Sequence, residues 1–209
     1  VLRVARFMSK LNSFGFTIAD ETAELINEIV NSGELDYLIP ERVWLETEKA
    51  LQTESFDVYF KILCDFNAIA YIYPDLNDID QVLANSSLTA YKNASPELKM
   101  ASIFCALDTL TDRNLIEHLD EIQNRIKFPN SYKIFTKTAL RTSRILRNSK
   151  ENISAEDVYE IIQATDAFRN PEDFGVIMEF HNHADHPDLK IKIRMILDAF
   201  DSCKDIGYD

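Results

Sequence analysis

Apolar residues recur along this chain at spacings of three and four, and almost nowhere do they alternate with polar residues. Spacings of three and four mark one face of an α-helix, whereas alternation would indicate a β-strand. Glycine occurs only 4 times in 209 residues, and most of the 6 prolines lie where a helix would begin. The pattern therefore predicts an all-α protein.

Glycine and proline divide the first part of the chain into four predicted helices, at about residues 1–13, 19–31, 40–51 and 55–73. Gly15 and Gly33 follow the first two, as is common after a helix C-terminus. Pro40 suits the first turn of the third helix, and Ser55 suits the cap of the fourth. The apolar spacing predicts inward positions for Val43, Trp44, Thr47 and Leu51 in the third helix and for Val58, Ile62, Leu63 and Phe66 in the fourth.

The stretch from residue 77 to residue 93 is the most polar and the least periodic, so we place a domain boundary near Asp75. This boundary divides the chain into residues 1–75 and 76–209. Beyond it, helices are expected at about residues 95–107, 113–126, 130–148 and 154–168, with two more starting at Asn170 and Pro187. Trp44 faces the predicted core, and we interpret it as a packing residue.

Basic residues are concentrated in one window of an acidic chain. The formal net charge of −13 disfavours nucleic-acid binding in general, so the distribution of charge must decide the question. Residues 125–150 contain no Asp or Glu, and Lys133, Lys137, Arg141 and Arg144 step by four, four and three along one predicted helix face. Most charged helix faces are simply solvated, but this basic stripe also suits phosphate groups.

Cysteine and histidine give little indication of chemistry. The three cysteines, Cys64, Cys105 and Cys203, are odd in number and widely spaced, which is typical of reduced thiols in a cytoplasmic protein. His181, His183 and His186 form a short cluster with Asp185, which we interpret as structural or exposed instead of metal-binding. Because no apolar stretch is long enough to span a membrane, we expect no membrane association.

Two segments carry a resemblance to a known family. The opening VLRVARFMSK and the run GELDYLIPERVWLETEKAL at residues 33–51 resemble the bacterial CCA-adding tRNA nucleotidyltransferases. The run Tyr73-Pro74-Asp75 follows in the order of that family, and weaker matches at residues 125–130 and 166–171 extend the resemblance over essentially the whole chain. The resemblance implies that residues 1–75 are a helical neck and body, and that residues 76–209 are a helical tail.

The resemblance also implies a function. Enzymes of this family add or repair the 3′-terminal CCA of tRNA from CTP and ATP, with Mg²⁺ held by an α/β head. That head is absent from these 209 residues, so we expect this chain to be a C-terminal piece that binds no catalytic metal and is inactive alone. Arg3 and Arg6 match family arginines that contribute to nucleotide binding, and guanidinium groups suit triphosphate oxygens. Through Lys133, Lys137, Arg141 and Arg144 the same piece is expected to contact tRNA.

The tail departs from the family in one respect. Members with this body often carry an HD phosphohydrolase domain, in which a His-Asp pair and outlying histidines bind metal. Cys105 and Ala106 stand at the matching place, and His118 is the only histidine within residues 76–180. Since metal phosphohydrolases need several imidazole and carboxylate ligands, we expect a degenerate HD-like tail that has kept its helices and lost the hydrolase chemistry.

Three other interpretations remain open from the sequence. Bacterial poly(A) polymerases share the head and neck architecture, although the segment at residues 33–51 looks more like the CCA-adding branch. The second alternative is a helical module that binds RNA or protein without catalysis. The third is a degenerate HD protein that senses nucleotides. The residues preceding Val1 in the reading frame would separate these possibilities.

Overall fold

The computed structural model describes residues 1–84, 87–111, 113–149, 153–183 and 187–206. Within them there are helices, turns and loops but no β-strand, so the predicted all-α class is confirmed. The α-helices are α1 (Leu2–Leu11), α2 (Asp20–Asn31), α3 (Pro40–Leu51), α4 (Phe56–Asp65), α5 (Ile69–Ile72), α6 (Ile79–Ala84), α7 (Pro96–Thr111), α8 (Leu115–Ile126), α9 (Asn130–Asn148), α10 (Ala155–Ala164), α11 (Pro171–Asn182) and α12 (Pro187–Ile206). Short 3-10 helices in the connections are η1 (Asn12–Phe14), η2 (Glu34–Tyr37), η3 (Pro74–Leu76) and η4 (Ser87–Tyr91).

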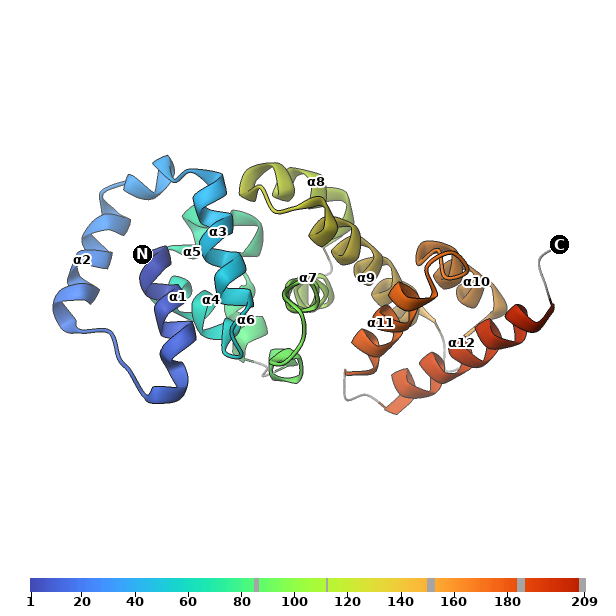
Figure 1. The fold of residues 1–209 in the computed structure, drawn as a ribbon. Coiled ribbons are helices and arrows are strands. Elements are labelled where there is room, and N and C mark those ends of the chain that lie inside the picture. The colour runs from blue at the N-terminus through green and yellow to red at the C-terminus, as the bar shows by residue number, and fades with distance from the viewer. Residues whose placement is uncertain (85–86, 112, 150–152, 184–186, 207–209) are drawn as a thin grey trace. The chain divides into compact units, whose positions relative to one another are not determined.

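The chain forms two compact units, residues Val1–Ile134 and Phe135–Asp209, and helix α9 starts in the first and continues in the second (Figure 1). Within the polar stretch at residues 77–93, residues 79–84 form α6 and residues 87–91 form η4, and both lie in the first unit. The predicted boundary near Asp75 between a body and a tail therefore does not coincide with the division between compact units. It stays a prediction about the family's domain organisation.

In the first unit, helix α1 packs against both α3 and α4. The predicted inward face of α3 is confirmed, because Val43, Trp44, Thr47 and Leu51 are all buried. The glycines after α1 and α2 also behave as expected: Gly15 and Gly33 have φ angles of 70° and 80°, a left-handed conformation that ends a helix most easily at glycine.

The predicted helix at residues 55–73 is wrong in its extent, and of its four predicted inward positions only Leu63 is buried. Helix α4 ends at Asp65, and Asn67 then adopts a positive φ of 55° before the short helix α5 begins. The Ala68 amide donates to the Leu63 carbonyl at 2.8 Å, which closes the end of α4 in the usual way for a left-handed cap. The fully buried side chains of α4 are Phe56, Tyr59, Phe60 and Leu63, while Val58, Ile62 and Phe66 are only partly buried.

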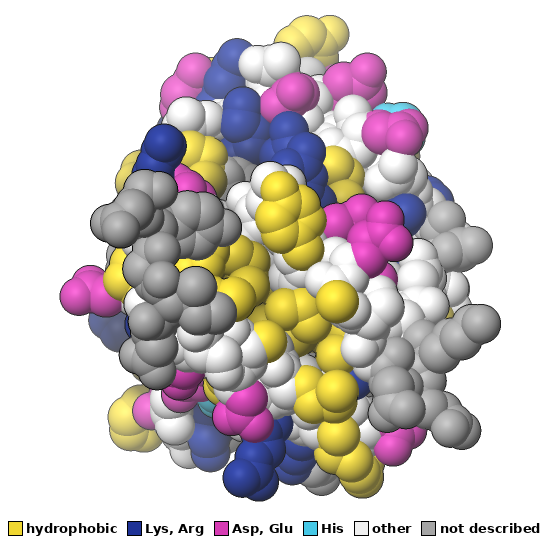
Figure 2. Space-filling view, turned by 90° about the vertical axis from the view of Figure 1, so that its right-hand side faces the viewer, with side chains coloured by type: hydrophobic (Ala, Val, Ile, Leu, Met, Phe, Trp, Pro, Cys, Tyr) yellow, Lys and Arg dark blue, Asp and Glu magenta, His cyan; other side chains and the backbone are white. Residues whose placement is uncertain are grey.

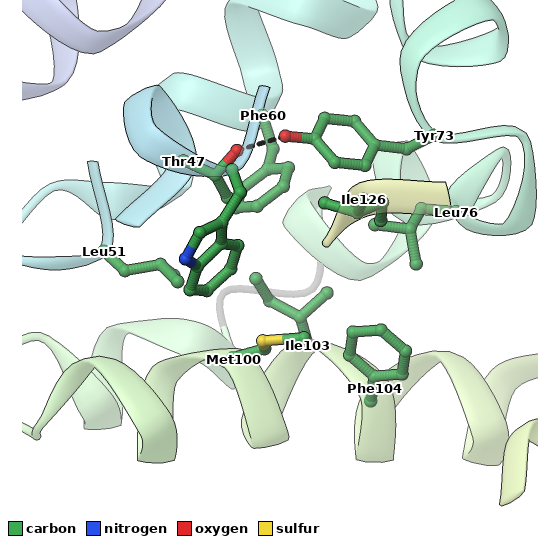
Figure 3. Close-up of a pocket in the computed structure, with 10 residues that line it drawn as sticks. Thr47, Leu51, Phe60, Tyr73, Leu76, Met100, Ile103, Phe104 and Ile126 are labelled. Carbon is green, nitrogen blue, oxygen red and sulfur yellow. Dashed lines mark hydrogen bonds between the residues drawn. The ribbon is translucent and has the colours of Figure 1, made fainter. Parts of the chain in front are cut away.

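A set of buried hydroxyl groups joins α3, α4 and the segment after α5. The Thr47 hydroxyl bonds the hydroxyls of both Tyr59 and Tyr73, and it donates to the Val43 carbonyl at 2.7 Å. Figure 3 shows Thr47 and Tyr73 facing each other above apolar side chains of α7, including Met100. Burial raises the pKa of Tyr73 to about 12, so this cluster is neutral at physiological pH.

The second unit combines the rest of α9 with α10, α11 and α12. Its core includes the rings of Phe174 and Phe200, whose centroids are 4.5 Å apart. The buried Lys192 ammonium donates to the Leu146 and Ser149 carbonyls at 3.1 and 3.0 Å, so it satisfies the carbonyl end of α9. Ser154 and Asp157 form a capping box at the start of α10.

Some hydrophobic side chains of the second unit are exposed. They include Tyr159 on α10 and Ile191 and Met195 on α12. Figure 2 shows hydrophobic side chains gathered near the centre of the face that it presents, with basic side chains above and below them.

None of the helices described is both long enough and apolar enough to cross a membrane.

Candidate functional site

Helix α1 presents the two arginines that the sequence singled out. Its buried face consists of Leu2, Ala5 and Ser9, which lie three and four positions apart and pack towards α3 and α4. Arg3 lies off this face and is exposed, whereas Arg6 lies at its border and is partly buried. The two arginines therefore occupy different environments although they are one turn apart.

Arg6 is held by an acidic residue of α3. Its Nε atom lies 2.5 Å from Oε2 of Glu46, and the two side chains are only 14% and 13% exposed. The other carboxylate oxygen of Glu46 lies 3.8 Å from Nζ of Lys49. Because a charge-assisted hydrogen bond between partly buried groups is strong, Glu46 fixes the orientation of the Arg6 guanidinium.

Arg3 has no such partner. Within the part of the chain that the structure describes, it forms no ion pair, and its guanidinium faces solvent. An exposed arginine of this kind is able to bind a phosphate without first giving up a protein contact. The structure thus divides the predicted nucleotide-binding pair into one free cation, Arg3, and one positioned cation, Arg6.

Trp44 serves packing, as its inward position predicted. Its ring meets the ring of Tyr132 edge to face, with centroids 4.7 Å apart, and lies 5.9 Å from the ring of Phe128. The Tyr132 hydroxyl donates to Oε1 of Glu48 at 3.3 Å. Burial and the nearby carboxylates of Glu97 and Glu48 raise the pKa of Tyr132, so it keeps the proton that it donates.

The basic stripe lies on α9, as the sequence predicted, but its members are not equivalent. Lys133, in the first unit, pairs with Asp120 of α8 at 3.1 Å. Lys137 and Arg141, in the second unit, form no ion pair with any described residue, and Arg141 is exposed. Arg144 lies three positions further along the same face and is partly buried.

Two other basic residues are already neutralised by acids in the first unit. Arg125 bonds the Asp75 carboxylate at 2.8 Å, and Arg113 forms an ion pair with Asp78. Arg125 belongs to the acid-free window of the sequence, yet its charge is balanced by a residue fifty positions away. The cations of the stripe that remain without an acidic partner are therefore Lys137 and Arg141 among the residues described.

The place that matches the family's His-Asp pair lies in the interior of the first unit. Cys105 is buried, and Ala106 beside it on α7 is partly buried. The nearby Asp108 is completely buried, and its Oδ1 accepts the Leu115 amide at 3.2 Å. This carboxylate is therefore used to begin α8. The described residues contain no group of three or more His, Cys, Asp or Glu that could hold a metal ion.

The histidine cluster is divided by its surroundings. His181 is buried on α11, where burial lowers the pKa of its imidazole to about 3. His183 is exposed, and its Nδ1 lies 2.7 Å from the Glu179 carbonyl oxygen. Asp185 and His186 lie outside the described residues. His181 is therefore a neutral residue of the core at physiological pH.

Glu46 belongs to this site, but the sequence did not identify it as a site residue. It appears in the segment that carried the family resemblance, but its partner Arg6 lies forty positions away. Spacing along a single helix gives no information about such a contact. The only available signal was the co-occurrence of the two motifs in one chain, and this does not indicate which residues meet.

Comparisons with known proteins find a matching family and several similar proteins. A family described as "Probable RNA and SrmB-binding site of polymerase A" matches residues 15–80, which run from the residue after η1 to the start of α6. The CCA-adding enzyme of Actinobacillus succinogenes is 31% identical over 83% of this chain and 48% of its own length. The CCA-adding enzyme of Blochmanniella floridana is also 31% identical, over 87% of this chain and 50% of its own length.

A third relative matches a shorter segment more strongly. The multifunctional CCA protein of Haemophilus ducreyi is 47% identical over 79 residues, which are 38% of this chain and 19% of that protein. The chain spans about half the length of the first two relatives. No solved structure shows significant similarity to it. With the motifs that the structure places on α1 and α3, these matches show that the chain is similar to CCA-adding enzymes over most of its own length and about half of theirs.

Proposed function

We propose that this chain supplies the nucleotide-positioning and tRNA-binding part of an enzyme that adds or repairs the 3′-terminal CCA of tRNA. The enzyme would use CTP and ATP and act in the cytoplasm. The names of the relatives and their identity over more than four-fifths of the chain support this proposal. The RNA-binding description of the family that matches residues 15–80 supports tRNA as the partner.

The single observation that carries the nucleotide role is the arrangement on α1. Arg6 is fixed by Glu46 from α3, and Arg3 lies exposed one turn earlier with no acidic partner in the described chain. A fixed guanidinium and a free one on the same helix suit the recognition of a triphosphate, since binding costs little reorganisation. In this proposal the two arginines hold and orient the incoming nucleotide.

Mg²⁺ is the metal that such an enzyme would use for nucleotidyl transfer. Among the described residues there is no group of three or more His, Cys, Asp or Glu that could hold a metal ion. In the proposal the metal is held by the head that the family resemblance implies.

The tRNA role rests on α9. Lys137 and Arg141 are cations without an acidic partner in the described chain, and they lie on one helix face next to Arg144. Contacts with the phosphate backbone need little more than such unpaired cations, and they carry no sequence information. The stripe would thus bind the backbone of every tRNA in the same way, which is what a general tRNA-repair enzyme requires.

The test has two parts. The 209-residue chain alone should bind tRNA in a salt-dependent manner, and the intact enzyme should incorporate CMP and AMP into tRNA that lacks CCA. Binding without incorporation would favour the second candidate, a helical RNA-binding module, to which the match at residues 15–80 also points. Failure of the chain to bind tRNA, together with the absence of incorporation, would overturn the proposal.

A further inference from the structure

A groove of about 580 Å³ lies in the first unit, between the second half of α1, the end of α3 and the turn that leads into α4. Its lining is polar. Hydroxyl groups come from Ser13, Thr53 and Ser55, and positive charges come from Arg6, Lys10 and Lys49. A groove lined by such residues suits a polar or charged ligand, because its walls offer hydrogen bonds and charge.

The charges in this groove are only partly balanced. Lys10 is exposed and forms no ion pair with the residues described. Lys49 is 44% exposed, and its 3.8 Å separation from Glu46 is longer than a hydrogen bond. Arg6 uses its Nε for Glu46. Glu54 is the one acidic residue of the lining, and Glu46 pairs with Arg6, so the three cations of the groove meet two carboxylates in a chain whose net charge is −13.

The walls of the groove are tied to one another by hydrogen bonds. The hydroxyls of Ser9 and Thr53 lie 2.5 Å apart, which joins α1 to the end of α3. The Asn12 side chain donates to the Ser55 hydroxyl at 3.2 Å, and the buried Lys99 donates to the Thr53 carbonyl at 2.8 Å. The turn at residues 52–55 is therefore held from two sides. A preformed polar groove loses little entropy when a ligand binds.

We propose that this groove binds a phosphate group through Lys10 and Lys49, and that the phosphate belongs to the backbone of the RNA substrate. Ammonium groups are effective partners for phosphate oxygens, and serine and threonine hydroxyls donate to the same oxygens. This proposal rests on the proposed function, since it assigns a second contact to the same RNA. Lys10 lies one helical turn beyond Arg6, so an RNA end that approaches the nucleotide arginines would pass this groove.

The test compares two double variants of the 209-residue chain. Lys10→Gln with Lys49→Gln removes the two flexible cations of the groove. Lys61→Gln with Lys92→Gln removes the same amount of charge from exposed positions of the first unit that do not line it. Binding of an RNA acceptor-stem hairpin and of ATP is measured for each protein across a salt series, with inorganic phosphate as competitor. Circular dichroism melting checks that all variants are folded.

We expect the groove variant to bind the hairpin about tenfold more weakly, with a shallower salt dependence, while the control variant loses less than twofold. A loss confined to ATP would keep the phosphate site and assign it to a nucleotide, which overturns the RNA assignment. Equal RNA and ATP binding by the groove variant and the parent would overturn the site itself. In that case hairpin binding by the parent would leave the proposed function intact, so the two failures are distinguishable.

Discussion

Arg6 of α1 and Glu46 of α3 form an ion pair across forty positions of the chain, and it joins the two segments that carry the family resemblance. Both side chains are more than four-fifths buried, so solvent screens their interaction only weakly. The position of the Arg6 guanidinium is consequently determined by α3 as well as by its own helix. Any change in the packing of α3 against α1 is then expected to affect the cation that we assign to nucleotide binding.

The first prediction concerns this pair. Glu46→Gln should lower the free energy of unfolding by about 2 kcal/mol, because it leaves a mostly buried guanidinium without its countercharge. Arg6→Gln should cost a similar amount. The double variant should lose clearly less than the sum of the two, and urea unfolding of all four proteins measures the difference. Additive losses would show that the two side chains do not interact in solution.

The second prediction separates the two arginines in the intact enzyme. Arg3→Ala should weaken CTP and ATP binding roughly ten- to a hundredfold, since it removes a charge-assisted phosphate contact. It should leave the melting temperature unchanged, because Arg3 is exposed and has no ion pair in the described chain. Arg6→Ala should weaken nucleotide binding and also lower the melting temperature. Steady-state kinetics and thermal melts measure the two effects. Unchanged kinetics in both variants would contradict the assignment of the two arginines to nucleotide binding.

His181 gives a prediction about pH. Its Nε2 is buried without a hydrogen-bond partner, while the ring also bonds the Ala139 backbone. Burial lowers the pKa of His181 to about 3 from an ordinary value of 6.5. Between these values the unfolded chain binds a proton that the folded chain does not bind. Stability therefore rises with pH across this window, and it falls when the pH is lowered from 6.5 towards 3.

The slope of this effect should approach about 1.4 kcal/mol per pH unit, the value for one proton. Urea unfolding of the parent at several pH values between about 4 and about 7 would measure this slope, because most of that range lies between the folded and unfolded pKa values of His181. His181→Leu should flatten the pH dependence by about that amount. His118→Gln, which replaces an exposed histidine, is the control. Identical slopes in the parent and His181→Leu would contradict the buried neutral state.

The sequence was sufficient where structure depends on neighbours along the chain. Pro40 and the Ser154–Asp157 capping box mark the starts of α3 and α10, and the apolar spacing in α3 identifies its buried face. The sequence was insufficient where a contact between residues far apart in the chain determines the local structure. The break at Asn67 divides an apolar stretch that looks continuous, since asparagine adopts the left-handed conformation without leaving a strong pattern. Lys192 bonds a carbonyl group in the last turn of α9, but in the sequence it cannot be told from an ordinary surface lysine.

The candidate site shows the same limit. Helical spacing correctly placed Lys133, Lys137, Arg141 and Arg144 on one helix, because that relation is local. It gave no warning that Asp120 would pair with Lys133. The charge of an exposed helix face depends on side chains that reach it from other helices. A stripe that looks uniform in the sequence is therefore uneven in the structure.

The last prediction uses this unevenness. Lys137→Gln with Arg141→Gln should weaken binding of all tRNAs by about tenfold and lower the slope of log affinity against log salt by about two. The reason is that each unpaired cation releases counterions when it meets a phosphate. Lys133→Gln alone should have a smaller effect, since Asp120 already balances that charge. Fluorescence anisotropy with two unrelated tRNAs measures both quantities.

A control double variant, Arg169→Gln with Arg194→Gln, removes the same charge from exposed positions of the second unit outside the stripe. Because backbone contacts are independent of sequence, both tRNAs should respond equally to the stripe variant and only weakly to the control. Equal losses in the two double variants would indicate general attraction between tRNA and any basic residue of this unit. A stripe variant whose affinity and salt slope match the parent would mean that Lys137 and Arg141 only face solvent.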